Sequence, residues 1–147
     1  MNSSPASSDL PLPLSELEAL LAGTLCERLG MRLVELSAAG GVMTMPVEGN
    51  LQPAGLLHGG ATIALAESIA SFAAILQARA VHGERANAVG TQVAATHHRS
   101  ARTGTVTATC TALHRGRQVA SYLVDVRDEE DRAISTITVS TMLLPPR

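Results

Sequence analysis

The sequence predicts an α+β fold in which a curved antiparallel sheet wraps around one long central helix. Residues 61–82 contain no Gly or Pro and are dominated by Ala, Leu and Ile, which is typical of a helix. This helix carries almost no charge, so other parts of the fold must cover it. From Ala86 onward the chain is rich in Thr and Val and alternates with period two, which indicates strands. A chain of 147 residues holds both parts in one domain.

The N-terminal part is expected to add a further helix over Ser15–Leu29. Ser15 and Glu18 form a capping-box pattern, leucines recur at helical spacing, and Gly30 follows as a stop signal. We interpret this helix as a structural element at the edge of the core or at a dimer seam. Residues 1–14 are rich in Ser and Pro and are expected to form a loose tail, which leaves 15–147 as the folded domain.

Six strands are expected, two before the long helix and four after it. Short turns connect the last four, so we expect them to pair in sequence order as an antiparallel meander. Such a sheet has one face available to bury the long helix. The expected strands are Leu33–Ser37, Val42–Val47, Ala88–Arg99, Thr105–His114, Val119–Arg127 and Ala133–Leu144.

The composition argues against nucleic-acid and membrane partners. The net charge is −2, so no broad positive field attracts nucleic acid or anionic lipid. Only Phe72 and Tyr122 are aromatic, which leaves no platform for stacking bases. Gly59–Leu76 approaches the length of a membrane span, but Glu67 lies near its centre and no aromatic or basic belt flanks it.

The two cysteines indicate the compartment. Cys26 and Cys110 lie far apart without the spacing of a metal site, so we interpret them as buried thiols in a reducing compartment. The first residues show no signal-peptide pattern, and a cytoplasmic protein is therefore expected. Neither a metal nor a cofactor is expected.

One acid and one glycine doublet stand out in the central helix. Glu67 lies in its middle, and Ser71 follows one turn later on the same face. His58, Gly59 and Gly60 lie at its start, where backbone N–H groups lack intrahelical partners and the helix dipole is positive. Glycine lets a ligand approach such donors closely. The arrangement suits a carbonyl oxygen that becomes an oxyanion during a reaction.

A single chain cannot bring the acid and the glycine doublet to one reacting atom. Glu67 lies about two turns into the helix, on the order of 12 Å along the axis from Gly59. A two-fold dimer removes this difficulty, because the glycine turn of one subunit then meets Glu67 of the other. The symmetry of such an interface supplies two sites per dimer.

Each of these residues also has a structural explanation that the sequence leaves open. Glu67 is either a buried acid that is paired with an arginine or capped by hydroxyls, or a general base or nucleophile that faces a cleft. His58 either caps the helix or takes a direct part in catalysis. Gln52 taken alone is a solvated loop residue, and Ser71 taken alone is a helix-packing residue. Only the combination indicates a functional site.

Residues 50–61, read together with 65–68, resemble the hotdog-fold acyl-CoA thioesterases. The matching strings are NLQPAGLLHGGA and LAES, and they resemble the branch containing 4-hydroxybenzoyl-CoA, phenylacetyl-CoA-type and dihydroxynaphthoyl-CoA thioesterases. The resemblance covers the chain from about Gly30 to Leu144. It implies the hotdog fold, a homodimer that pairs into a dimer of dimers, and hydrolysis of an acyl-CoA substrate.

The resemblance also implies a role for each matching residue. Glu67 is expected to be the catalytic carboxylate, acting as a nucleophile or as a base for water. Gly59 is expected to donate its backbone N–H to the thioester oxygen across the dimer interface. His58 and Gln52 are expected to position the thioester, and Ser71 to orient water.

Two further strings resemble regions that contact the nucleotide part of coenzyme A in this family. THHRSAR at 96–102 resembles an Asn-His-x-Arg-Ser-x-Arg strand end, and LHRG at 113–116 resembles a Leu-His-x-Gly turn. Guanidinium groups pair well with phosphates, which favours the arginines of these strings. The adjacent His97 and His98 point to opposite faces of a strand, which argues against a shared metal ion. The residues expected to bind substrate are Gly60, His97, Arg99, Arg102, His114 and Arg115.

Two other functions are compatible with the same fold. A non-catalytic acyl-CoA-binding protein would bind CoA esters without releasing free thiol. An enoyl-CoA hydratase or dehydratase needs an acid and a base around the α and β carbons, and no Asp-x-x-x-x-His string is present. Both aryl and medium-chain acyl groups are compatible with a chain that is poor in aromatic residues and rich in Ala and Leu.

Overall fold

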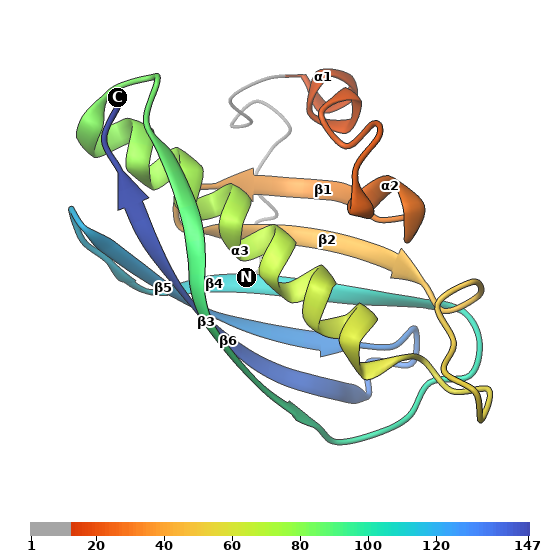
Figure 1. The fold of residues 1–147 in the computed structure, drawn as a ribbon. Coiled ribbons are helices and arrows are strands. Elements are labelled where there is room, and N and C mark those ends of the chain that lie inside the picture. Colours follow the sequence, from red (N-terminus) through yellow and green to blue (C-terminus); the bar gives the residue numbers. More distant parts are fainter. Residues whose placement is uncertain (1–12) are drawn as a thin grey trace, which may run out of the picture.

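The computed structural model describes residues 13–147 and confirms a long helix covered by one antiparallel sheet (Figure 1). The central helix, α3, spans Gly59–His82. The six strands are paired in the order β1-β2-β4-β5-β6-β3. Their bounds are β1 Arg32–Ser37, β2 Gly40–Pro46, β3 Asn87–His97, β4 Thr105–Arg115, β5 Val119–Arg127 and β6 Ala133–Leu144.

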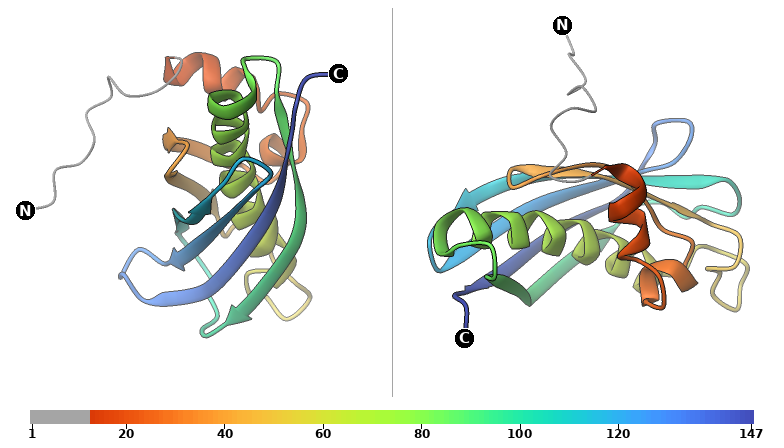
Figure 2. Two further views of the ribbon diagram at one scale, coloured as in Figure 1. Left: turned by 90° about the vertical axis from the view of Figure 1, so that its left-hand side faces the viewer. Right: turned by 90° about the horizontal axis from the view of Figure 1, so that it is seen from above.

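Helix α3 lies along one face of the curved sheet, as Figure 2 shows from two further directions. By length and mean hydropathy (1.6), this helix is the one helix within the described residues that is apolar enough to cross a membrane. Its side chains nevertheless pack against the sheet, where small residues allow close approach of the helix to the strands. The buried residues of α3 are Thr62, Leu65, Ala66, Ile69, Ala70, Ala73, Ala74, Gln77 and Ala78.

The expected meander is wrong for the strand that follows α3. β4, β5 and β6 pair in sequence order, but β3 pairs with β6 at the edge of the sheet. β2 occupies the other side of β4, from Gly40↔Thr111 to Pro46↔Thr105, and leaves no free edge there for β3. As a result β3 is an edge strand that runs beside α3.

The N-terminal helix expected over Ser15–Leu29 is two short helices. α1 covers Leu14–Ala19 and α2 covers Leu25–Arg28, with Gly23 at a φ of 73° in the turn between them. A left-handed φ suits glycine and ends the first helix early. The expected capping box is also wrong, because α1 begins after Pro13 and no side chain caps it. The tail expected over residues 1–14 falls mainly on residues 1–12, which lie outside the described residues.

Strand β3 is exposed along most of its length. Apart from Ala88 and Val93, each of its residues is exposed. Within residues 13–147 β3 pairs only with β6, so its outer backbone edge is unpaired. An open edge of this kind is ready to pair with another strand.

Candidate active site

The N-terminal end of α3 presents one free backbone donor. His58 is the N-cap: its Nδ1 accepts the Gly60 N–H at 2.9 Å, and its carbonyl accepts from Ala61 at 3.0 Å and from Thr62 at 3.2 Å. Among residues 13–147, no acceptor lies within hydrogen-bond distance of the Gly59 N–H. The helix dipole adds partial positive charge at the same place, so this end can bind a developing negative charge.

The loop before α3 is anchored to its surroundings, which fixes the position of Gly59. The Asn50 side chain donates to the Leu29 and Pro46 carbonyls, both at 2.8 Å. The Asn50 carbonyl in turn accepts the His58 N–H at 2.9 Å. Leu57 donates its N–H to the Ala101 carbonyl at 2.7 Å. The donor at Gly59 is therefore held rigidly, as oxyanion stabilisation requires.

A cavity of about 320 Å³ opens beside Gly59. It lies between the loop before α3, the start of α3 and the segment that follows β3. Apolar side chains form part of its wall, with a histidine and an arginine at its edge. The lining residues include Gln52, Leu56, Gly59, Thr62, His97, Arg99 and Ile134.

The His97 side chain lines the cavity next to Gly59. Its Nδ1 lies 2.6 Å from the hydroxyl oxygen of Ser135, the residue it pairs with on β6. The other ring nitrogen faces Gly59: a Cβ added at residue 59 would lie only 2.8 Å from Nε2. Glycine at position 59 thus leaves room for the imidazole next to the free N–H.

Glu67 faces the same edge strand further along α3. Its carboxylate lies over Gly90, where any Cβ would overlap Oε1. The pairing of β3 with β6 is irregular between Gly90 and Gln92, so a bulge lies under the carboxylate. Glu67 is partly buried, and within residues 13–147 it has neither a hydrogen-bond donor nor a cationic partner. The structure therefore does not pair Glu67 with an arginine.

Only some of the expected site residues lie together within this chain. Gln52, Gly59, His97 and Arg99 line the cavity. Gly60 and His58 bond to each other as the helix cap. Arg102 lines a neighbouring hollow beside the acidic turn at 128–130. Glu67 and Ser71 lie further along α3 and do not line the cavity.

His114 and Arg115 lie at the opposite end of the molecule. The turn at 114–117 contacts the C-terminal end of α3, where Gln77 donates to the Gly116 carbonyl at 3.1 Å. Helix α3 has 24 residues, so this turn is on the order of 35 Å from Gly59. The expected role of His114 and Arg115 in substrate binding therefore stays a prediction, because within this chain β4 ends far from the cavity at Gly59.

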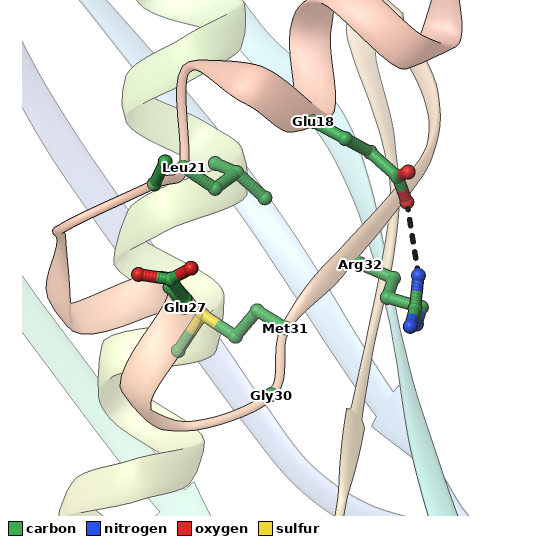
Figure 3. Close-up of a pocket in the computed structure, with 7 residues that line it drawn as sticks. Glu18, Leu21, Glu27, Gly30, Met31 and Arg32 are labelled. Carbon is green, nitrogen blue, oxygen red and sulfur yellow. Dashed lines mark hydrogen bonds and ion pairs between the residues drawn. The ribbon is translucent and has the colours of Figure 1, made fainter.

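A second cavity, of about 230 Å³, lies between α1, α2 and β1 (Figure 3). At its rim Arg32 forms an ion pair with Glu18 at 3.4 Å, and Glu27 accepts the Gly23 N–H at 2.7 Å. Its acids are thus engaged in holding the N-terminal helices. In the part of the chain that the structure describes, no three His, Cys, Asp or Glu side chains are grouped to hold a metal ion.

Two residues of the site region, Gly90 and Ser135, are not predicted from the sequence. Gly90 allows the close approach of Glu67, and an isolated glycine inside a strand is a recognised signal for such a contact. Ser135 holds His97, and only the pairing of β3 with β6 brings these two together. The meander expected from the sequence separates them.

Comparisons with known proteins show what the chain is similar to. The family described as Thioesterase superfamily matches residues 54–135. A protein of Deinococcus radiodurans, named only as an esterase, is 45% identical over 115 residues, or 78% of this chain and 70% of that protein. The proofreading thioesterase EntH of Cronobacter turicensis is 39% identical over 134 residues, covering 90% of this chain and 95% of the relative.

The solved structures point the same way. A thioesterase from Haemophilus influenzae superposes with a TM-score of 0.84 at 31% identity, covering 92% of this chain and 93% of the other. A thioesterase variant from Pseudomonas aeruginosa gives a TM-score of 0.84 at 30% identity, covering 93% and 97%.

Proposed function

Because the chain belongs to the thioesterase superfamily and is a thioester hydrolase of the hotdog fold, we propose that it hydrolyses acyl-CoA thioesters at a site shared by two subunits. One observation carries the proposal: two groups that have no partner within residues 13–147 lie beside the open edge strand β3. These are the Gly59 N–H, which can polarise a carbonyl, and the Glu67 carboxylate, which can act as a base or nucleophile.

Pairing of β3 with its own copy would bring the two groups together. Antiparallel pairing about a two-fold axis at Ala94, counted across the bulge at Gly90–Gln92, places Gly90 opposite the partner's His97. Glu67 lies over Gly90, and Gly59 lies beside His97. Paired strands are about 4.8 Å apart, so the carboxylate of one subunit and the free N–H of its partner reach one thioester group.

The reaction then needs only the groups that the two subunits supply. The thioester oxygen accepts the Gly59 N–H, which draws electron density from the carbonyl carbon. Glu67 takes a proton from a water molecule held by Ser71, and the water oxygen attacks the carbonyl carbon. The tetrahedral intermediate collapses, the C–S bond breaks, and the CoA thiolate takes the proton back from Glu67. The products are a carboxylic acid and CoA thiol. Direct attack by Glu67 through an anhydride, followed by hydrolysis, gives the same balance.

The other site residues have supporting roles in this proposal. His58 sets the start of α3 through its bond to Gly60, so its contribution is to hold the oxyanion donor in place. Gln52 lines the cavity and positions the thioester from the loop side. The acyl group, aryl or medium-chain, lies between α3 and its copy, beside the partly buried Ile63 and Phe72.

The nucleotide end of CoA is assigned to the segment after β3. Arg99 lines the cavity and Arg102 lies in the adjoining hollow, and both guanidinium groups are exposed. Exposed arginines next to the cavity suit the CoA phosphates. The proposal further includes a dimer of dimers and a cytoplasmic location, and it requires no metal or cofactor.

The proposal is tested by replacing the carboxylate with an amide of the same size. Glu67→Gln is expected to lower kcat by at least about 10²- to 10³-fold, because the catalytic charge is removed and the shape is kept. Release of CoA thiol is followed with a thiol-trapping reagent, and binding of a non-hydrolysable CoA thioether is measured by calorimetry. Glu84→Gln, an exposed change beyond the end of α3, is the matched control. Near-normal turnover by Glu67→Gln would remove Glu67 from the mechanism.

A further inference from the structure

Ser135 carries a fully buried hydroxyl and follows Ile134, which lines the cavity. Its exposed fraction is 0%, and within residues 13–147 its hydroxyl has one hydrogen-bond partner, the His97 Nδ1 at 2.6 Å. The two residues are directly paired across β6 and β3. A short bond inside the protein fixes the ring orientation of an imidazole more firmly than a bond to water does.

The direction of this hydrogen bond follows from burial. A buried hydroxyl proton without an acceptor is costly, and Nδ1 is the acceptor within reach. Ser135 therefore donates, and Nδ1 of the neutral ring accepts. In that tautomer the ring proton is on Nε2, because each neutral imidazole has one donor and one acceptor nitrogen.

Nε2 is the ring atom that faces Gly59. It is the nearest atom to the place where a side chain at residue 59 would begin, at 2.8 Å, whereas ring carbons Cδ2 and Cε1 are at 3.3 Å and 3.4 Å. Both Gly59 and His97 line the cavity. An N–H on Nε2 therefore lies beside the free N–H of Gly59.

We propose that Ser135 is a positioning residue that holds His97 as the Nε2–H tautomer, so that the imidazole is a second donor to the thioester oxygen beside the Gly59 N–H. This inference rests on the proposed thioesterase function. It assigns the oxyanion site two converging donors, the usual number in acyl-transfer sites. Without the Ser135 hydroxyl, the neutral ring is free to place its proton on Nδ1, and Nε2 then repels the oxyanion.

The tautomer is measured first, in the free protein and without any substrate. Long-range ¹H–¹⁵N spectra of the histidine ring distinguish Nδ1–H from Nε2–H at a pH where His97 is neutral. The wild-type protein is expected to show Nε2–H at His97, and Ser135→Ala a mixture of both tautomers. Thr141→Ala is the matched control: Thr141 is also buried on β6, and its hydroxyl donates to the Ala120 carbonyl at 2.9 Å, away from His97.

Kinetics separate positioning from a purely structural role. Ser135→Ala is expected to lower kcat about 10-fold with a smaller change in KM, and Thr141→Ala to leave kcat within about 2-fold. His97→Gln places an amide N–H near the position of Nε2 without needing Ser135. In the His97→Gln background, adding Ser135→Ala is expected to change kcat less than 2-fold, because the two residues act as one unit.

The outcomes are distinct. An Nδ1–H tautomer in the wild type, or an unchanged tautomer in Ser135→Ala, overturns the role of Ser135 even if the protein is an active thioesterase. An equal loss of kcat in both backgrounds overturns it as well, because the hydroxyl would then act only on stability. A wild-type protein that holds the Nε2–H tautomer but hydrolyses no CoA ester instead overturns the proposed function, and leaves the hydrogen-bond assignment supported.

Discussion

Gly90→Ala is the sharpest perturbation that the structure offers, because the atoms nearest to the added methyl group all belong to the Glu67 side chain. The three atoms nearest to a Cβ at residue 90 all belong to Glu67, with Oε1 closest, then Cδ at 3.4 Å and Cγ at 3.7 Å. Gly90 is not among the glycines with a positive φ, so alanine can adopt its backbone conformation. The substitution therefore displaces the Glu67 carboxylate and leaves its chemistry unchanged.

The size of the effect follows from the contact. To restore van der Waals separation from the methyl group, the carboxylate must move by on the order of 1 Å. A misplacement of that size typically costs about 10²-fold in rate when the group is catalytic. The Glu67 carboxylate is the flexible end of a long side chain, so the free energy of unfolding is expected to change by less than about 1 kcal/mol.

The assay combines steady-state hydrolysis of an acyl-CoA with thermal unfolding of the same samples. Val89→Ala, at the adjacent position of β3, is the control for a change on the edge strand, because neighbouring strand residues point to opposite faces. We expect Gly90→Ala to lose about 10- to 100-fold in kcat while Tm stays within a few degrees of the wild type. A folded Gly90→Ala protein with normal turnover would refute the reasoning that the carboxylate acts from its place over β3.

Two further predictions concern substrate binding and pH. Arg99→Ala and Arg102→Ala are each expected to raise KM about 3- to 10-fold for CoA esters but not for acyl-N-acetylcysteamine thioesters, which lack the nucleotide. Arg85→Ala, an exposed change beyond the end of α3, is the control, and equal effects on both substrates would contradict the assignment. Burial raises the pKa of the Cys110 thiol from 9.0 to about 12 and that of the Tyr122 hydroxyl from 10.0 to about 12. Stability from these protonated groups is fully present below pH 9 and is lost as the pH rises from about 9 towards 12, because the unfolded chain ionises first. Urea unfolding is expected to show a loss of about 1 kcal/mol from Cys110 between pH 8 and pH 10, and Cys110→Ala is expected to reduce it; equal midpoints for the wild type would contradict this.

Much of the fold was predictable because its elements have strong local signals. Helix α3 ends at His82, the last residue of the run without Gly or Pro that predicts the helix. The hairpin of β1 and β2 and the bounds of β5 and β6 match the expected strands within one or two residues. In these segments periodicity, Gly and Pro act locally, so no knowledge of neighbours in space is needed.

The failures concern choices that depend on contacts far apart in the sequence. Pairing of β3 with β6 depends on β2 occupying the edge of β4, and no local pattern reports this. The single N-terminal helix predicted from the leucine spacing is wrong, because the chain turns at Gly23. An isolated glycine inside a helical pattern is a recognised signal for such a break.

The candidate site was predictable where one short segment supplies it. Gly59, Gly60 and His58 form the helix start as expected, and Glu67 lies on α3 without a cationic partner in the described chain. The contributions of Gly90 and Ser135 come from strands that the sequence does not place next to the helix or to His97. The substrate-binding role of His114 stays a prediction, since a turn motif does not state at which end of the sheet it lies.

The central claim, that each site takes Gly59 from one subunit and Glu67 from the other, is tested most directly by mixing two inactive variants. Glu67→Gln removes the carboxylate, and Gly59→Ala pushes into His97 and disturbs the oxyanion site. After the two proteins are unfolded together and refolded at equal concentrations, half of the dimers are hybrids, and each hybrid has one intact site of two. The account predicts recovery of about one quarter of wild-type activity in the mixture. A mixture as inactive as either variant alone, in which hybrid dimers are demonstrated by mass spectrometry, would contradict it.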